Sequence, residues 1–150
     1  MTSGANIWDF AQGAYASPGF APTAIRLQDA AGVDVCIILV VLWFAANGRR
    51  LGATDVAQLE AEAAPWRRDV IEPLRAARRA MKGRVGAETL RDGARSLELE
   101  AERGLLERLA ALPLGAQGVP DAAATLRAYA ALIGTEFSAA DLVALSPSIA

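Results

Sequence analysis

The densest group of charged side chains lies between residues 67 and 84. Seven of these 18 residues are basic, and only Asp69 and Glu72 oppose them. The basic residues are Arg67, Arg68, Arg75, Arg78, Arg79, Lys82 and Arg84. Several of them follow helical steps, which predicts a positive stripe along one helix face. Because the planar fork of a guanidinium group matches a phosphate or a carboxylate, the stripe could bind a small anion, a nucleic-acid backbone or an acidic partner protein.

Acidic residues elsewhere in the chain offer another interpretation, in which the arginines are paired within the protein. The candidate partners are Asp29, Asp34, Glu98 and Glu102. Asp29 and Asp34 stand five residues apart and could give oxygen ligands to a divalent cation, but two carboxylates are few for such a site. Asp34 is also placed to cap a helix. We therefore predict capping and ion pairing, and no metal site.

Five aromatic residues could line a ligand pocket or belong to the core. They are Trp8, Phe10, Tyr15, Trp43 and Trp66. Ligand pockets are mostly apolar with a few polar groups, so aromatic side chains near an arginine stripe would suit one. Aromatic residues at helical spacing are more often part of a core, and the sequence leaves both interpretations open.

Two compositional features exclude whole classes of chemistry. The 150 residues include no histidine, which removes Ser-His-Asp catalysis, Cys-His catalysis and histidine-ligated zinc. The single cysteine, Cys36, excludes an intramolecular disulfide and a site with four cysteine ligands. None of the common glycine-rich phosphate loops occurs. These features predict no cofactor and favour a protein that is not an enzyme.

The remaining bulk properties concern location and partners. The amino terminus, MTSGANIWDFAQG, has no basic region and contains Asp9, so no signal peptide is predicted. One cysteine in an apolar run fits a reducing compartment, and we expect a cytoplasmic protein. The net charge of −2 argues against nucleic-acid binding, because dedicated binders tend to be basic overall.

An uncharged run, VCIILVVLWFAANG, occupies residues 35–48. A membrane-spanning helix needs about 20 apolar residues, so this shorter run predicts a buried core helix and no membrane span. Asp34 before the run and Asn47-Gly48 at its end match the signals that begin and end helices. Because a helix that is apolar on all sides must be surrounded, residues 35–47 are expected to form the centre of the fold.

Shorter amphipathic helices are expected on both sides of this centre. Asn6 can cap a first helix, and a second is expected over residues 22–31. Thr54 is predicted to cap a short helix, and Pro65 to occupy the first turn of the next one. Pro73 is expected to kink that helix one residue earlier, because proline lacks an N–H group and clashes with the carbonyl four residues back.

The longest helix is expected over residues 87–112. One apolar stripe along it consists of Leu90, Ala94, Leu97, Ala101, Leu105, Leu109 and Leu112, and a second consists of Leu99, Leu106 and Ala110. Two stripes predict contacts on two sides, either within one bundle or across a dimer interface. Asp121 and a capping box at Ser138 are predicted to begin two further helices, and no β-hairpin is predicted.

Together these elements predict an all-α fold. We expect a single bundle of about five or six main helices around residues 35–47, with a small helical C-terminal appendage. The corresponding division is a helical domain over 1–112, a linker over 113–120 and a helical extension over 121–150.

Several clusters of residues resemble a known bacterial family. The first clusters are Trp8-Asp9-Phe10, Tyr15-Ala16, Pro18-Gly19, Leu27-Gln28-Asp29, Gly32, Asp34-Val35 and Leu42-Trp43. The later ones are Pro65-Trp66-Arg67, Val70, Pro73-Leu74-Arg75, Arg78-Arg79 and the run from Glu98 to Arg103. The pattern covers about residues 7–110 and resembles an uncharacterised proteobacterial domain of unknown function, found in small helical proteins. The resemblance implies a cytosolic helical fold and no particular activity.

Three functional hypotheses follow from these observations. The first is a non-enzymatic interaction protein that binds a protein partner, or a second copy of itself, through the arginine face or a leucine stripe. The second is a helical bundle that binds an acidic or phosphorylated small molecule between the aromatic residues and the arginine segment. The third is an enzyme that uses Asp29 or Asp34 as a base. The polar residues expected to form the binding face or a paired network are Gln28, Asp29, Asp34, Arg67, Arg75, Arg78, Arg79 and Glu98.

Overall fold

A computed structural model describes residues 6–146 and shows an all-α bundle, as predicted. The helices are α1 (Ile7–Ala16), α2 (Phe20–Ala31), α3 (Val35–Ala46), α4 (Ala53–Trp66), α5 (Glu72–Met81), α6 (Glu88–Ala110), α7 (Ala122–Leu132) and α8 (Ala139–Leu145). A π-helical turn, η1 (Arg67–Ile71), joins α4 to α5, and two short strands, β1 (Arg49–Arg50) and β2 (Ala116–Gln117), pair with each other. No described helix is long and apolar enough to cross a membrane.

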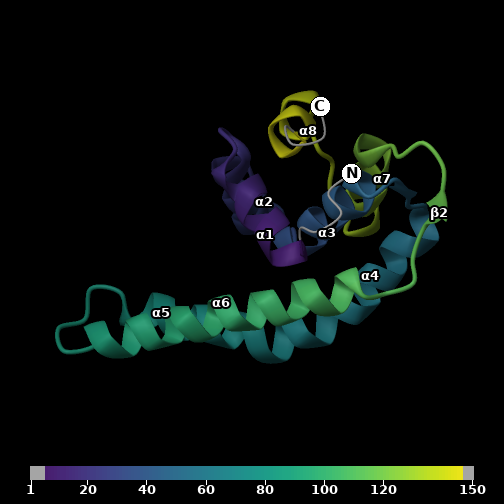
Figure 1. Ribbon diagram of the computed structural model, residues 1–150. Helices are drawn as coiled ribbons and strands as arrows, with labels where there is room; N and C mark the ends of the chain where they lie inside the picture. Colours follow the sequence, from purple (N-terminus) through teal and green to yellow (C-terminus); the bar gives the residue numbers. More distant parts are fainter. Residues whose placement is uncertain (1–5, 147–150) are drawn as a thin grey trace.

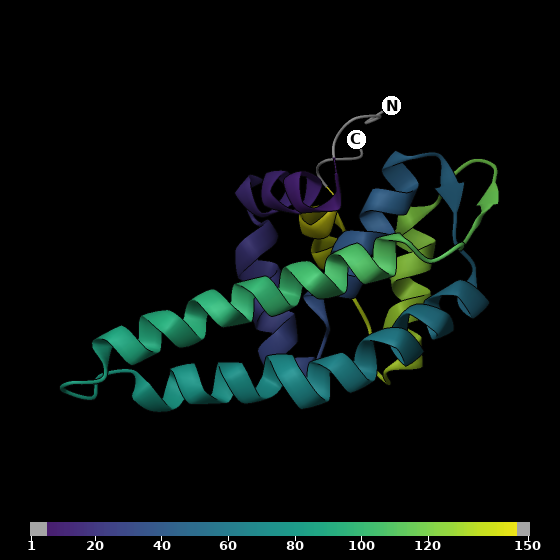
Figure 2. The same ribbon diagram turned by 60° about the horizontal axis from the view of Figure 1, so that its bottom comes forward.

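The molecule consists of a body, formed by α1, α2, α3, α7 and α8, and a projecting arm, formed by α5 and the first half of α6. Figure 1 shows α1, α2, α3, α7 and α8 grouped together, while α5 and the first half of α6 extend well beyond them. In Figure 2 the continuous rod of α4, η1 and α5 runs alongside α6 in the opposite direction. The inner ends of both rods lie against the body. The arm therefore exposes much more of its surface than the rest of the fold.

The central helix α3 is where the apolar run predicts it. Residues from Val35 to Leu42 are all buried, and Leu42 has no exposed surface. The Asp34 carboxylate accepts a hydrogen bond from the backbone N–H of Cys36 at 2.9 Å, which fixes the beginning of the helix. Side-chain capping also begins α1 at Asn6, α7 at Asp121 and α8 at Ser138, as predicted.

Two predicted helix starts are wrong. Helix α4 begins two residues earlier than expected, because Gly52 is the capping residue and the Asp55 carboxylate accepts the Gly52 N–H at 2.9 Å. Thr54 therefore lies inside the first turn. Pro65 does not begin a helix but lies near the end of α4, which continues without a break into η1.

A π-helical turn lies just before Glu72, where the kink is predicted. The Glu72 N–H donates to the carbonyl of Arg67, five residues earlier, just before Pro73. A wider turn at this point accommodates a proline that cannot donate and whose ring crowds the carbonyl four residues back. The turn also changes the angular spacing along the helix, which affects where Arg67 and the later arginines point.

The strand pairing was not predicted, because each strand has only two residues. Arg49 lies opposite Gln117, and the Arg49 guanidinium donates to the carbonyls of Leu114 and Gly115. Gly115 has a φ of +79°, and a Cβ there would lie 3.0 Å from the Leu51 side chain. A glycine is therefore required where the segment over 113–120 crosses the body.

The C-terminal helices contribute to the same core as α3. Leu126 and Tyr129 of α7 and Leu145 of α8 are buried in that cluster. Helix α7 packs on α3 and α4, and α8 packs on α2, where Arg26 forms an ion pair with Asp141. The division into residues 1–112 and 121–150 stays a prediction about folding units.

The two apolar stripes on α6 have different surroundings along their length. Leu105 and Leu109 are buried in the body, whereas Leu90 is 67% exposed and Leu97 is 53% exposed on the arm. In the second stripe, Leu106 is buried and Leu99 is partly exposed. The second stripe is therefore not a continuous surface, because its inner part is already covered by the body.

Candidate functional site

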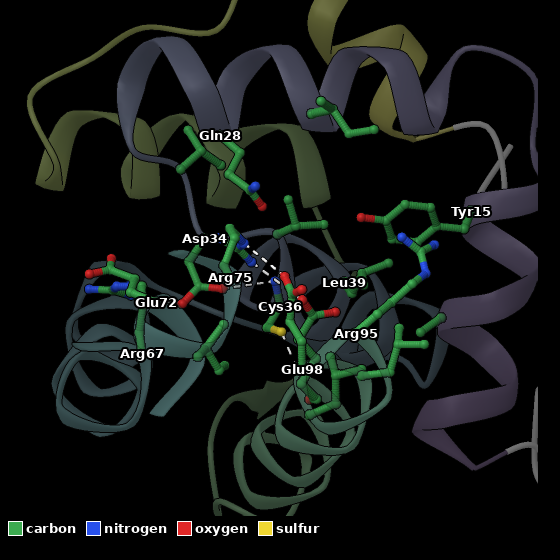
Figure 3. A pocket seen from close by; sticks show the side chains of 18 of the residues that line it. Tyr15, Gln28, Asp34, Cys36, Leu39, Arg67, Glu72, Arg75, Arg95 and Glu98 are labelled. Carbon is green, nitrogen blue, oxygen red and sulfur yellow. Dashed lines mark hydrogen bonds and ion pairs between the residues drawn. The ribbon is translucent and has the colours of Figure 1, made fainter. Parts of the chain in front are cut away.

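A cavity of about 510 Å³ lies where the arm meets the body. Its walls come from α1, α2, the first two turns of α3, η1 with α5, and α6. Figure 3 shows that the lining side chains point inward from all of these elements toward a shared space. Volumes of this size are typical of small-molecule sites, which are about 300–1,000 Å³.

The first polar cluster of the wall is centred on Asp34. Its carboxylate accepts a hydrogen bond from Arg67 at 2.7 Å in addition to the one from Cys36. Arg67 also makes two hydrogen bonds with the Glu60 carboxylate, at 3.1 and 2.7 Å. The backbone N–H of Asp34 donates to the Tyr129 hydroxyl at 2.8 Å. These bonds tie the beginning of α3 to η1, α4 and α7, and they leave Arg67 fully engaged.

The second polar cluster joins the two helices of the arm. Glu98 is only 5% exposed and accepts Arg75 Nε at 3.0 Å and Arg78 Nε at 2.6 Å. Arg75 also donates to Glu102 at 3.3 Å. Burial opposes the ionisation of Glu98, but the bonds from Arg78 and Arg75 outweigh it and lower its pKa. A buried carboxylate between two arginines holds α5 at a defined position on α6.

Glu102 differs from Glu98 in its balance of burial and partners. Burial raises the pKa of Glu102, and the single bond from Arg75 does not compensate for it. The neighbouring Glu98 carboxylate raises the pKa of Glu102 further. This wall of the cavity consequently disfavours additional negative charge.

Several other lining residues have polar groups without hydrogen bonds or ion pairs within residues 6–146. Among them are Tyr15 on α1, Gln28 on α2 and Arg95 on α6. Tyr15 extends inward, Gln28 reaches into the same space from above, and Arg95 extends toward Tyr15 (Figure 3). Burial, together with the nearby Glu102 carboxylate, raises the pKa of Tyr15 to about 12, so its hydroxyl is a donor at neutral pH.

The structure brings together most of the predicted polar residues. Gln28, Asp34, Arg67, Arg75, Arg78 and Glu98 all line the cavity. Asp29 and Arg79 lie outside it and form an exposed ion pair at 3.2 Å. The sequence left two interpretations of these arginines open, a free basic face or pairing with acidic residues. The structure shows the pairing. The face predicted for partner binding is thereby largely neutralised.

The five aromatic residues divide between pocket and core. Trp8 and Tyr15 line the cavity, whereas Phe10, Trp43 and Trp66 do not. Trp66 instead donates from its indole to the Ala101 carbonyl at 2.9 Å and lies beneath the guanidinium of Arg108. Trp43 packs edge-on against Phe44. Their roles are structural, consistent with aromatic residues at helical spacing in a core.

Sequence analysis missed Arg95 as a site residue. It lies on one face of α6 with Leu99, Glu102 and Leu106, at steps of four, three and four residues, and all four line the cavity. This spacing could have been recognised as a helix face. Arg95 lies outside the dense basic segment over residues 67–84.

The carboxylates considered for metal binding and for catalysis, Asp29 and Asp34, both have partners in the structure. Among residues 6–146, no group of three acidic or cysteine side chains is placed to hold a metal ion. Asp34 caps α3 and binds Arg67, and Asp29 is paired at the surface with Arg79. Each carboxylate therefore has a structural partner.

The fold and site define a class of protein: a helical bundle with a partly apolar cavity bounded by arginine–carboxylate pairs. The chain belongs to a family described as proteins of unknown function (DUF2390), whose model matches residues 6–109. This confirms the resemblance to a domain of unknown function, and every residue that lines the cavity lies within the match. No curated protein and no solved structure shows a significant match to the chain.

Proposed function

We propose that this protein binds a small organic molecule with an acidic group in the cavity between the arm and the body. The observation that carries the proposal is an open cavity whose lining includes Arg95, the lining arginine without an ion pair within residues 6–146. Pockets that bind small molecules combine apolar walls with a few polar groups, and this cavity has that composition.

The rim of the cavity supports an apolar part in the ligand. Tyr15, Ile25 and Leu99 are 40%, 50% and 44% exposed, and all three line the cavity. Large apolar side chains left in water at one place favour binding of an apolar group. The ion-pair clusters on the opposite walls are made without a ligand, so little ordering is required on binding.

A cavity-filling substitution tests the proposal. We expect Leu99→Trp to weaken binding of the apolar anion 1-anilinonaphthalene-8-sulfonate at least tenfold, which corresponds to about 1.4 kcal/mol. Fluorescence titration measures this affinity. Leu97→Trp is the matched control, because Leu97 lies two residues away on the same helix at similar exposure and does not line the cavity. Equal affinities of the two variants, or no saturable binding by the wild type, would contradict the proposal.

A second candidate function, self-association through the arm, is favoured by the exposed leucines. Leu90 and Leu97 are more than half exposed where α6 extends beyond the body (Figure 1). The arginine face gives less support to partner binding, because Arg67, Arg75 and Arg78 are engaged within the chain. Exposed apolar residues on a projecting helix pair are suited to packing against a second such pair.

Sedimentation equilibrium tests this second candidate. We expect the wild type to sediment above its monomer mass and the variant Leu90→Glu to sediment as a monomer, because a buried unpaired carboxylate opposes association. Glu88→Gln on the same turn serves as the control for a change in charge. A wild type that stays monomeric at high concentration would exclude this function.

A further inference from the structure

Most of the charged side chains that line the cavity form ion pairs with one another. Four arginines line it, and they are Arg67, Arg75, Arg78 and Arg95. Four carboxylates also line it, and they are Asp34, Glu72, Glu98 and Glu102. The first three arginines bind carboxylates within hydrogen-bond distance, so their charges are not available to a ligand.

Arg95 is the lining arginine that has no carboxylate partner within residues 6–146. It extends toward Tyr15, whose hydroxyl has no hydrogen bond among the same residues. Glu72, the lining carboxylate without a partner there, lies at the opposite side of the view in Figure 3. An unpaired guanidinium that extends toward an unpaired phenol donor is an arrangement suited to binding a carboxylate.

From this arrangement we infer that the ligand is a monocarboxylate with an apolar body, whose carboxylate binds Arg95 and the Tyr15 hydroxyl. The inference rests on the proposed function and assigns its ligand class. A phosphate monoester carries up to two negative charges and would need a second unpaired cation, which the described lining does not offer.

The orientation of the ligand follows from the face of α6 that lines the cavity. Arg95 and Leu99 lie at its exposed end, whereas Leu106, two to three turns further along, is only 2% exposed. Leu39 on α3 is also buried and lines the same inner part. The carboxylate is therefore held toward the mouth, and the apolar body extends inward over aliphatic side chains.

A matched series of eight-carbon compounds tests the ligand class by isothermal titration calorimetry. We expect octanoate to bind the wild type at least tenfold more tightly than 1-octanol and octyl phosphate. In Arg95→Met, octanoate should lose at least tenfold in affinity while 1-octanol changes less than twofold. Arg91→Met, one turn away on α6 and outside the cavity lining, should leave both affinities within twofold of the wild type.

The outcomes separate this inference from the function on which it rests. If none of the compounds binds the wild type, the proposed function fails as well. If 1-octanol binds as tightly as octanoate, the cavity takes apolar ligands but the carboxylate assignment is wrong. Tighter binding of octyl phosphate overturns the ligand class, and unchanged octanoate affinity in Arg95→Met overturns the role of Arg95.

Discussion

Replacing Glu98 with alanine is expected to lower the free energy of unfolding by about 3 kcal/mol, as for other buried ion pairs that lose one partner. Glu98 accepts hydrogen bonds from both Arg75 and Arg78, so its removal leaves two guanidinium groups, each only about 20% exposed, without their main acceptor. Denaturant unfolding followed by circular dichroism measures the change. The control is Glu100→Ala on the same helix, where an exposed side chain should change stability by less than about 0.5 kcal/mol.

The effect of Glu98→Ala should also depend on pH. The folded-state pKa of Glu98 lies below the ordinary value of 4.5, so the protein binds fewer protons at this site when folded. The stabilisation is therefore fully present above that ordinary value and is lost as the pH falls through the lower folded-state pKa. We expect the difference between wild type and variant to shrink below about pH 4. A difference that stays constant down to acid unfolding would show that the loss comes from packing rather than charge.

Leu126→Ala is expected to destabilise the whole protein by about 3 kcal/mol, within the range for large-to-small substitutions in a core. Leu126 has no exposed surface and belongs to the same buried cluster as α3. Its helix, α7, packs on both α3 and α4, so the cavity left by the substitution lies inside the common core. Leu132→Ala on the same helix is the control, because Leu132 is 49% exposed.

The same experiment examines whether residues 121–150 fold separately. We expect tryptophan fluorescence and circular dichroism to give one coincident transition for the wild type and for Leu126→Ala, since all three tryptophans lie in the first 66 residues. Two separate transitions, with the fluorescence transition unaffected by Leu126→Ala, would identify an independent C-terminal unit.

Four of the five predicted helix caps, which depend on local interactions, agree with the structure, and Thr54 is the exception. Asn6, Asp34, Asp121 and Ser138 cap helices because their side chains bond to backbone groups within three residues. Pro65 and Pro73 were misinterpreted, because the helix continues through both of them by widening into a π-helical turn. Packing along α6 favours a single helical rod at this point. The local sequence contains no signal for that packing.

The candidate site was predictable in part. The residue types and helical spacing of the arginine segment, with Asp34 and Glu98 as partners, led to the ion-pair clusters that line the cavity. The cavity itself and the unpaired state of Arg95 were not predictable. The cavity and the pairing of Arg95 both depend on the distance of α1 and α2 from α6. That distance is determined by all the contacts between the helices.

The sequence by itself determined the helical class, the central position of residues 35–46 and the exclusion of histidine-dependent chemistry. Only the tertiary structure decided which of the arginines that line the cavity are paired with carboxylates within residues 6–146. The reason is that the deciding ion pairs join residues 20 to 33 positions apart in the chain, on different helices. Coulomb attraction and hydrogen bonding act over a few ångströms in space, so they depend on the packing of α3, α5 and α6 and not on spacing along one helix.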